Sequence, residues 1–175
     1  HLRKVDLTLG RQPISFGNGR FFTPMDLVSP FTPAVIDTEY KPGVDAFRVD
    51  VYPSFSSSIT AVAAYTGQEG WKGDWTERDL TAAFYGQGAI GVTDLGGMYA
   101  YVEGDHVVAA TVATGIGPVG VYGDVAVTVP REDLEDEVFV RATLGLDGRP
   151  TGTTTVSGEI YVQSFGTHDP GDLLT

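Results

Sequence analysis

The chain has 175 residues, a formal net charge of −12 and no cysteine. A single domain spanning residues 1–175 is the expectation at this length. The negative charge argues against a nucleic-acid partner, whose phosphates need a cationic surface, and the lack of thiols excludes disulfides and thiolate metal sites. No run of about 18 apolar residues occurs, so the sequence predicts no transmembrane helix.

Apolar and polar residues alternate with the two-residue period of a β-strand along most of the chain. The first strand, residues 5–9, places Val5, Leu7 and Leu9 on one face. Further strands are expected at residues 44–52, 58–65, 80–90, 95–103, 106–113, 119–129, 138–146 and 156–163. About nine strands joined in succession predict an all-β fold, an antiparallel up-and-down meander that closes most simply as a β-barrel.

The expected connections between these strands alternate in length. Those after residues 52, 90, 113 and 146 are mostly short, whereas those after Gly17, Tyr65 and Val129 are longer and more charged or aromatic. Such an asymmetry between two rims is typical of bacterial outer-membrane barrels. One connection departs from it, because Gly104-Asp105 predicts a tight turn on the rim of the long loops.

The longest connection, residues 17–43, is rich in apolar side chains such as Phe21, Phe22 and Met25. A loop of this length in a compact domain is usually functional or disordered, and its apolar content argues against disorder. We therefore expect it to fold into the interior of the barrel as a constriction. Its charged groups are Asp26, Asp37, Glu39 and Lys41.

Alternation alone does not separate a soluble β-sandwich from a transmembrane barrel. Three features favour the membrane. Charged side chains occur in the middle of strands on the polar face. The side chains of the apolar face are small and aliphatic. Aromatic residues are expected near strand ends, as in the aromatic girdles at a membrane interface. These aromatic residues are Tyr52, Tyr65, Phe84, Tyr85 and Tyr99.

Three short motifs carry a resemblance to a known family: Gly10-Arg11-Gln12, then Ile14-Ser15-Phe16-Gly17, then Tyr40-Lys41-Pro42-Gly43-Val44-Asp45-Ala46. Together they resemble the opening strand–loop–strand of porin-like outer-membrane β-barrel proteins of Gram-negative bacteria. The resemblance covers about the first third of the chain. The last residue, Thr175, is not the terminal aromatic of a complete barrel, and no apolar leader precedes the first strand, so the resemblance implies a fragment.

This resemblance implies part or all of a transmembrane β-barrel in the outer membrane, in contact with its lipid. The implied function is passive or weakly selective diffusion of small hydrophilic solutes, without cofactor or metal. An oligomer of identical chains is left open. The alternative is a soluble, secreted β-sandwich that acts as a carbohydrate-binding or adhesion module, with Trp71, Trp75 and Tyr85 stacking on sugars.

Charged side chains on the polar faces are the candidate pore lining. Rows of arginine opposite carboxylates create a transverse field that orders water and sorts solutes by charge. Arg11 shares parity with the apolar Leu7 and Leu9, so it needs a bulge at Gly10 or a strand that has already left the membrane. The alternative is an ordinary wet face of a sheet. The candidates are Arg11, Arg20, Arg48, Asp50, Asp124, Arg141 and Glu159.

Other motifs point away from enzymatic chemistry, and we expect no enzyme. Gly115–Gly120 matches G-x-G-x-x-G, but Pro118 interrupts it and a strand follows, so it predicts a turn. The acidic run 132–137 lacks the spacing of a calcium-binding loop, and a solvated loop is the preferred interpretation. The three histidines, His1, His106 and His168, are isolated from one another.

Overall fold

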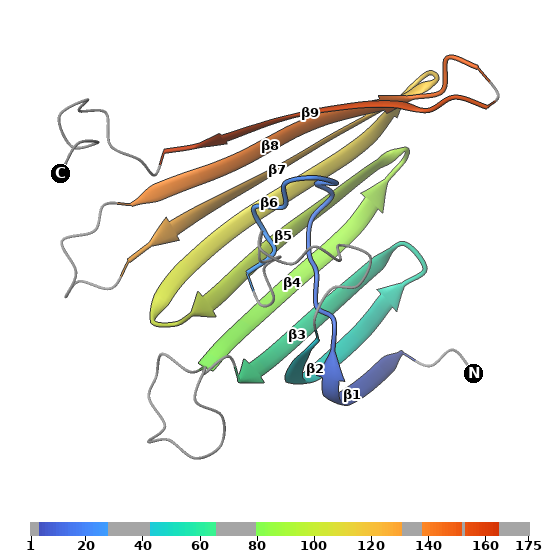
Figure 1. Ribbon diagram of the computed structural model, residues 1–175. Helices are drawn as coiled ribbons and strands as arrows, with labels where there is room; N and C mark the ends of the chain where they lie inside the picture. Colours follow the sequence, from blue (N-terminus) through green and yellow to red (C-terminus); the bar gives the residue numbers. More distant parts are fainter. Residues whose placement is uncertain (1–3, 28–42, 66–79, 131–137, 152, 165–175) are drawn as a thin grey trace, which may run out of the picture.

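The computed structural model describes residues 4–27, 43–65, 80–130 and 138–164, apart from residue 152. Nine strands form one antiparallel sheet in the order of the sequence (Figure 1), which confirms the predicted all-β meander. The strands are β1 (Val5–Gln12), β2 (Val44–Ser54), β3 (Ser57–Tyr65), β4 (Leu80–Ile90), β5 (Thr93–Val102), β6 (Asp105–Ile116), β7 (Val119–Val129), β8 (Phe139–Gly148) and β9 (Val156–Gln163).

Short turns join β2 to β3, β4 to β5 and β6 to β7 at one end of the sheet. The turn predicted from Gly115–Gly120 is confirmed: β6 ends at Ile116, and Gly117 adopts a φ of 61° before Pro118. The tight turn between β5 and β6 lies one residue earlier than predicted. Its two residues are Glu103 and Gly104, with φ of 53° and 108°, the left-handed pair that suits the twist of a hairpin.

The sheet is open. Among the described strands, β1 pairs only with β2 and β9 pairs only with β8. Strands β5 and β6 extend further than predicted because their pairing continues to Thr93 opposite Thr114, whose hydroxyls are hydrogen-bonded at 2.9 Å. Asp94 and Gly115 at these ends have weak strand propensity, but cross-strand contacts outweigh local propensity.

The two faces of the sheet differ in polarity. The face that carries Asp50, Thr60, Tyr85 and Met98, which follow one another across paired strands, is called the inner face. The opposite, outer face is lined by aliphatic and aromatic side chains. Many are well exposed, including Leu9 at 83%, Ile160 at 67%, Leu144 at 60% and Val108 at 58%.

Residues 13–27, the blue segment that crosses the sheet in Figure 1, pack on the inner face. Ile14 and Met25 are fully buried, and the Phe16 ring lies 5.1 Å from that of Tyr85. The strands offer small side chains where the segment inserts large ones, which is how the layers interdigitate. The small partners are Ala46, Ala64, Ala83, Ala100, Ala109 and Ala126.

Two of the aromatic residues assigned to a girdle lie elsewhere. Tyr85 is on the inner face, only 8% exposed, because its ring packs under Phe16. Phe84 is exposed on the outer face but sits in the middle of β4, opposite Tyr99. The girdle prediction was wrong for these two residues, because both lie near the middle of residues 80–90, which bound this strand in the prediction and in the structure alike.

Candidate functional site

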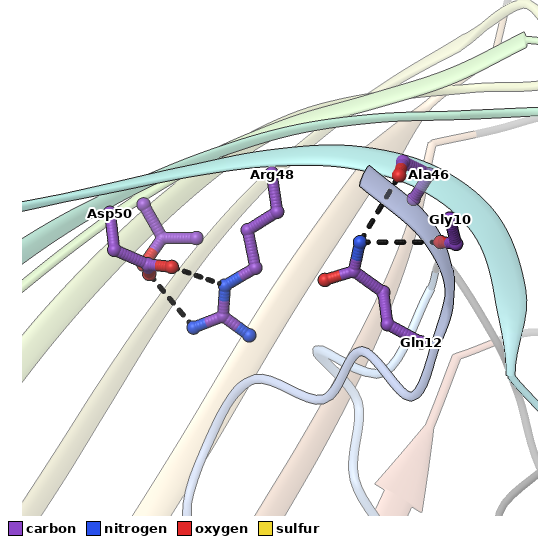
Figure 2. Close-up of polar contacts among 6 residues, drawn as sticks. Gly10, Gln12, Ala46, Arg48 and Asp50 are labelled. Atoms are coloured by element: carbon purple, nitrogen blue, oxygen red, sulfur yellow. Dashed lines mark hydrogen bonds and ion pairs between the residues drawn. The ribbon is translucent and has the colours of Figure 1, made fainter. Parts of the chain in front are cut away.

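The inner face carries a bidentate ion pair between neighbouring positions of β2. Nε and Nη2 of Arg48 donate to the two carboxylate oxygens of Asp50 at 2.7 and 2.8 Å, as Figure 2 shows. The hydroxyl of Thr60 on β3 donates to the same carboxylate at 2.6 Å. The planar fork fixes both side chains. Beside them, the Gln12 amide bridges the backbone carbonyls of Gly10 and Ala46.

A second carboxylate, that of Asp124 on β7, receives backbone donors from the covering segment. The amides of Asn18 and Gly19 donate to it, the latter at 2.7 Å, and the Thr111 hydroxyl donates from β6. Gly17 just before them has a φ of 92°, and a Cβ there would lie 2.7 Å from the Asp124 carboxylate. Glycine is therefore required for this close approach.

Glu159 on β9 repeats the arrangement for the next residues. Its carboxylate accepts hydrogen bonds from the backbone amides of Arg20 at 3.0 Å, Phe21 at 3.3 Å and Phe22 at 2.7 Å. The Tyr122 hydroxyl donates to it as well, at 2.9 Å. Successive backbone amides that converge on one anion form a nest, and here the anion belongs to the protein itself.

Tyr122 reaches Glu159 because the position beneath its ring is a glycine. A Cβ on Gly145 would collide with the Tyr122 ring. The Arg20 side chain completes this corner: it forms a 3.2 Å ion pair with Asp147, and its guanidinium lies 5.8 Å from the centre of the Tyr122 ring. The two carboxylates and their partners thus hold residues 17–22 across the strands β6 to β9.

Two pockets open on the inner face beside this segment. One of about 390 Å³ is bordered by hydroxyl and amide side chains such as Ser57 and Gln87. The other, of about 290 Å³, is bordered by Arg20 and Asp147. Asn18 and Asp94 border both pockets, so the covering segment leaves polar space on either side of Asn18.

Six of the seven predicted pore-lining residues lie on the inner face or in the segment that covers it, at both sides of the sheet, while Arg11 does not. Strand β1 pairs with β2 without a register shift, so no bulge at Gly10 turns Arg11 inward. It lies on the outer face, exposed, in an ion pair of 3.1 Å with Asp45. Its parity with Leu7 and Leu9 is the physical reason. The six are Arg20, Arg48, Asp50, Asp124, Arg141 and Glu159.

The remaining residues singled out in the sequence are the charged groups of the long loop, the acidic run, the tryptophans and the histidines. Asp26 is 9% exposed within the covering segment. Asp37, Glu39 and Lys41 lie outside the described residues, as do the acidic run 132–137 and both tryptophans. His106 lies in β6 against the Tyr99 hydroxyl at 2.8 Å. Within the described ranges, no group of three or more histidine, aspartate or glutamate residues is placed to hold a metal ion.

Several residues of the site were missed from the sequence. Asn18 and the glycines on either side of it place backbone amides on Asp124, and Tyr122 links β7 to Glu159. The run Gly17-Asn18-Gly19 was a usable signal, because two glycines free the backbone to approach a side chain closely. For Tyr122 the signal was weaker, since its partner lies 37 residues further along the chain.

Comparison with protein-family models, with curated proteins and with solved structures finds no match to this chain. Among the described residues there is also no helix long and apolar enough to cross a lipid bilayer. The two faces of the sheet and the segment that covers one of them are therefore the features that bear on function.

Proposed function

We propose that the chain forms part of the wall of a porin-like β-barrel in a bacterial outer membrane, through which small hydrophilic solutes diffuse passively or with weak selectivity. The observation that carries the proposal is the inverted polarity of the sheet. Its large exposed apolar side chains lie on the outer face, and its buried carboxylates with their hydrogen bonds lie on the inner face.

The outer face supports the lipid contact. Soluble proteins rarely expose a contiguous apolar patch larger than a few hundred Å². Here apolar residues adjoin one another across neighbouring strands, for example Leu7, Val49, Ala61, Phe84 and Tyr99. Outer-membrane strands alternate in this sense, with apolar residues toward lipid and polar residues toward the lumen.

The inner face supports the passage of hydrophilic solutes. The segment 13–27 narrows the lumen, and its position is held by Asp124 and Glu159. The polar pockets on either side of Asn18 are the spaces left for water and solutes. Paired and unpaired charges along such a path sort solutes by charge and size.

Strand direction bears on how the barrel is completed. Nine strands, each antiparallel to its neighbours, leave β1 and β9 running in the same direction. A direct β1–β9 pair would be parallel, whereas bacterial outer-membrane barrels are antiparallel with an even number of strands. On this proposal the sheet is one part of a larger barrel, and an odd number of further antiparallel strands closes it.

A labelling experiment tests the membrane contact. The chain has no native cysteine, so a thiol-reactive probe attaches only at an introduced cysteine. Val162→Cys and Gln163→Cys place a fluorescent probe on opposite faces of β9 at adjacent, exposed positions. In liposomes with brominated acyl chains we expect strong quenching at 162 and little at 163. Equal quenching at both positions, or a monodisperse protein in plain buffer, rejects the proposal.

Stepwise currents across a planar bilayer containing the protein test the channel itself. A protein that is soluble without detergent and silent in bilayers would instead favour the carbohydrate-binding alternative. The carbohydrate-binding alternative expects Trp71, Trp75 and Tyr85 to stack on sugars. Tyr85 is buried under Phe16, so its ring is not presented to solvent.

A further inference from the structure

Two buried polar atoms on the inner face lack a hydrogen-bond partner in the part of the chain that the structure describes. They are the hydroxyl oxygen of Thr128 on β7 and Nε of Arg141 on β8. Thr128 is 3% exposed, so bulk solvent does not compensate its hydroxyl. Buried polar groups in folded proteins are almost always paired, and an orphan points to a bound ion, ligand or water.

The strand register brings these two side chains together. On the paired strands, Arg141 lies opposite Ala126, and Phe139 lies opposite Thr128. The Arg141 guanidinium carbon is 5.5 Å from the centre of the Phe139 ring, so the side chain leans along β8 toward the position that faces Thr128. Arg141 and Thr128 are diagonal neighbours on one face, a separation that a long side chain spans.

In the described part of the chain, no ion pair balances the charge of Arg141, in contrast to three other arginines. Arg11, Arg20 and Arg48 each form an ion pair with an aspartate. None of the ion pairs among the described residues includes Arg141. Its register partners Ala126 and Gln163 carry no charge, in a chain whose net charge is −12. Its buried Nε therefore lacks an acceptor among the described residues.

We propose that Arg141 and Thr128 form a binding site for a small oxyanion, the carboxylate or phosphate group of a solute. Arg141 Nε–H and the Thr128 hydroxyl both donate, so the ligand supplies only acceptors. Phe139 covers the guanidinium, and the buried Ala126 and Val107 surround the position. Apolar walls of this kind strengthen charge-assisted hydrogen bonds.

The test of this site does not depend on the proposed channel, because binding is measured on the purified, folded protein, whether it is kept in detergent or in plain buffer. Sodium acetate, phosphate and sulfate are compared with chloride at constant ionic strength, and thermal unfolding reports the affinity through ligand stabilisation. Phosphate and sulfate stabilise proteins generally through exclusion from the surface, so the decisive quantity is the difference between the wild type and each variant.

Three variants separate the site from general charge effects. Arg141→Gln removes the guanidinium, Thr128→Val replaces the orphan hydroxyl by a methyl group of the same shape, and Arg149→Gln removes an equal charge from an exposed loop. We expect the apparent affinity to fall about tenfold or more in Arg141→Gln, by a smaller factor in Thr128→Val, and not at all in Arg149→Gln. Thr128→Val is expected to fold, because the change removes an unpaired buried donor.

Chemical modification gives a second readout in the same chain. Bound oxyanion is expected to slow the reaction of phenylglyoxal with Arg141 several-fold while the rate at Arg149 stays unchanged, as read by peptide mass spectrometry. Equal stabilisation of the wild type and Arg141→Gln by all three oxyanions overturns the proposal. So does a Thr128→Val variant with wild-type affinity, or uniform protection of every arginine.

Discussion

The backbone amide of Phe22 donates a 2.7 Å hydrogen bond to the carboxylate of Glu159, which lies 137 residues further along the chain. This contact ties the segment that follows β1 to β9, the strand at the opposite edge of the sheet. The donors from residues 18–22 to Asp124 and Glu159 are backbone groups. These two carboxylates therefore hold the backbone of the segment, while the Arg20–Asp147 ion pair and the buried Ile14 and Met25 hold its side chains.

Replacing that carboxylate is expected to loosen the segment. Glu159→Gln keeps the shape but turns charge-assisted bonds into neutral ones, and we expect a loss of about 1–3 kcal/mol of unfolding free energy. Hydrogen exchange at the amides of residues 20–22 should accelerate, while amides of β6 keep their protection. The matched control is Glu103→Gln, an exposed turn residue. Unchanged exchange at 20–22 would show that the hydrogen bonds to Glu159 do not protect these exposed amides.

The approach of the segment to Asp124 requires a glycine at position 17. Gly17→Ala places a Cβ against the Asp124 carboxylate at a φ of 92°, so strain and a clash add. Gly10→Ala is the control, because Gly10 also has a positive φ, 117°, but open space around it. We expect Gly10→Ala to cost about 1 kcal/mol and Gly17→Ala clearly more. If urea unfolding showed equal losses of unfolding free energy in the two variants, backbone strain alone would account for the loss in Gly17→Ala.

The contact between Tyr122 and Gly145 predicts a coupled loss. Gly145→Ala pushes the Tyr122 ring away and with it the hydrogen bond from its hydroxyl to Glu159. Gly158→Ala, where a Cβ meets nothing within 4 Å, is the control. We expect a loss of roughly 1–3 kcal/mol for Gly145→Ala and little change for the control. In a Tyr122→Phe background most of the hydrogen-bond part of the loss should vanish, as a double-mutant cycle measures.

Two arginine–aspartate pairs on β2 and its neighbour β1 allow a direct comparison of burial. Arg48→Met leaves Asp50, 6% exposed, without its cation, and we expect a loss of roughly 2–3 kcal/mol, below that of a fully buried pair because Arg48 is itself partly exposed. Arg11→Met, at the exposed pair with Asp45, should cost less than about 1 kcal/mol. Equal costs in the two unfolding curves would contradict this account of the inner face.

On the proposed function, the unpaired arginine controls selectivity more than the paired one. The charge of Arg48 is neutralised by Asp50, whereas none of the ion pairs among the described residues involves Arg141. Arg141→Gln should therefore shift the reversal potential in a salt gradient toward cations, and Arg48→Gln should shift it less. A larger shift of the reversal potential for Arg48→Gln than for Arg141→Gln would show that Arg141 does not control the charge selectivity of the lumen.

Much of the sheet was predictable because its pattern is local. Alternation placed all nine strands, and it put Arg11 on the same side as Leu7 and Leu9, where the structure has it. The lining prediction that named Arg11 went against this parity and was wrong for that residue. The ends of β5 and the packing of Phe16 on Tyr85 were not predictable in the same way, since pairing and burial decide them.

By itself the sequence determined the antiparallel meander and the polarity of its two faces, because a period of two residues assigns each side chain to a face without reference to distant parts of the chain. Only the tertiary structure decided which charges meet. Asp124 and Glu159 bind amides more than a hundred residues away, and the buried Nε of Arg141 has no hydrogen-bond partner among the described residues. Such contacts depend on where residues 13–27 settle on the inner face, and no local pattern encodes that position.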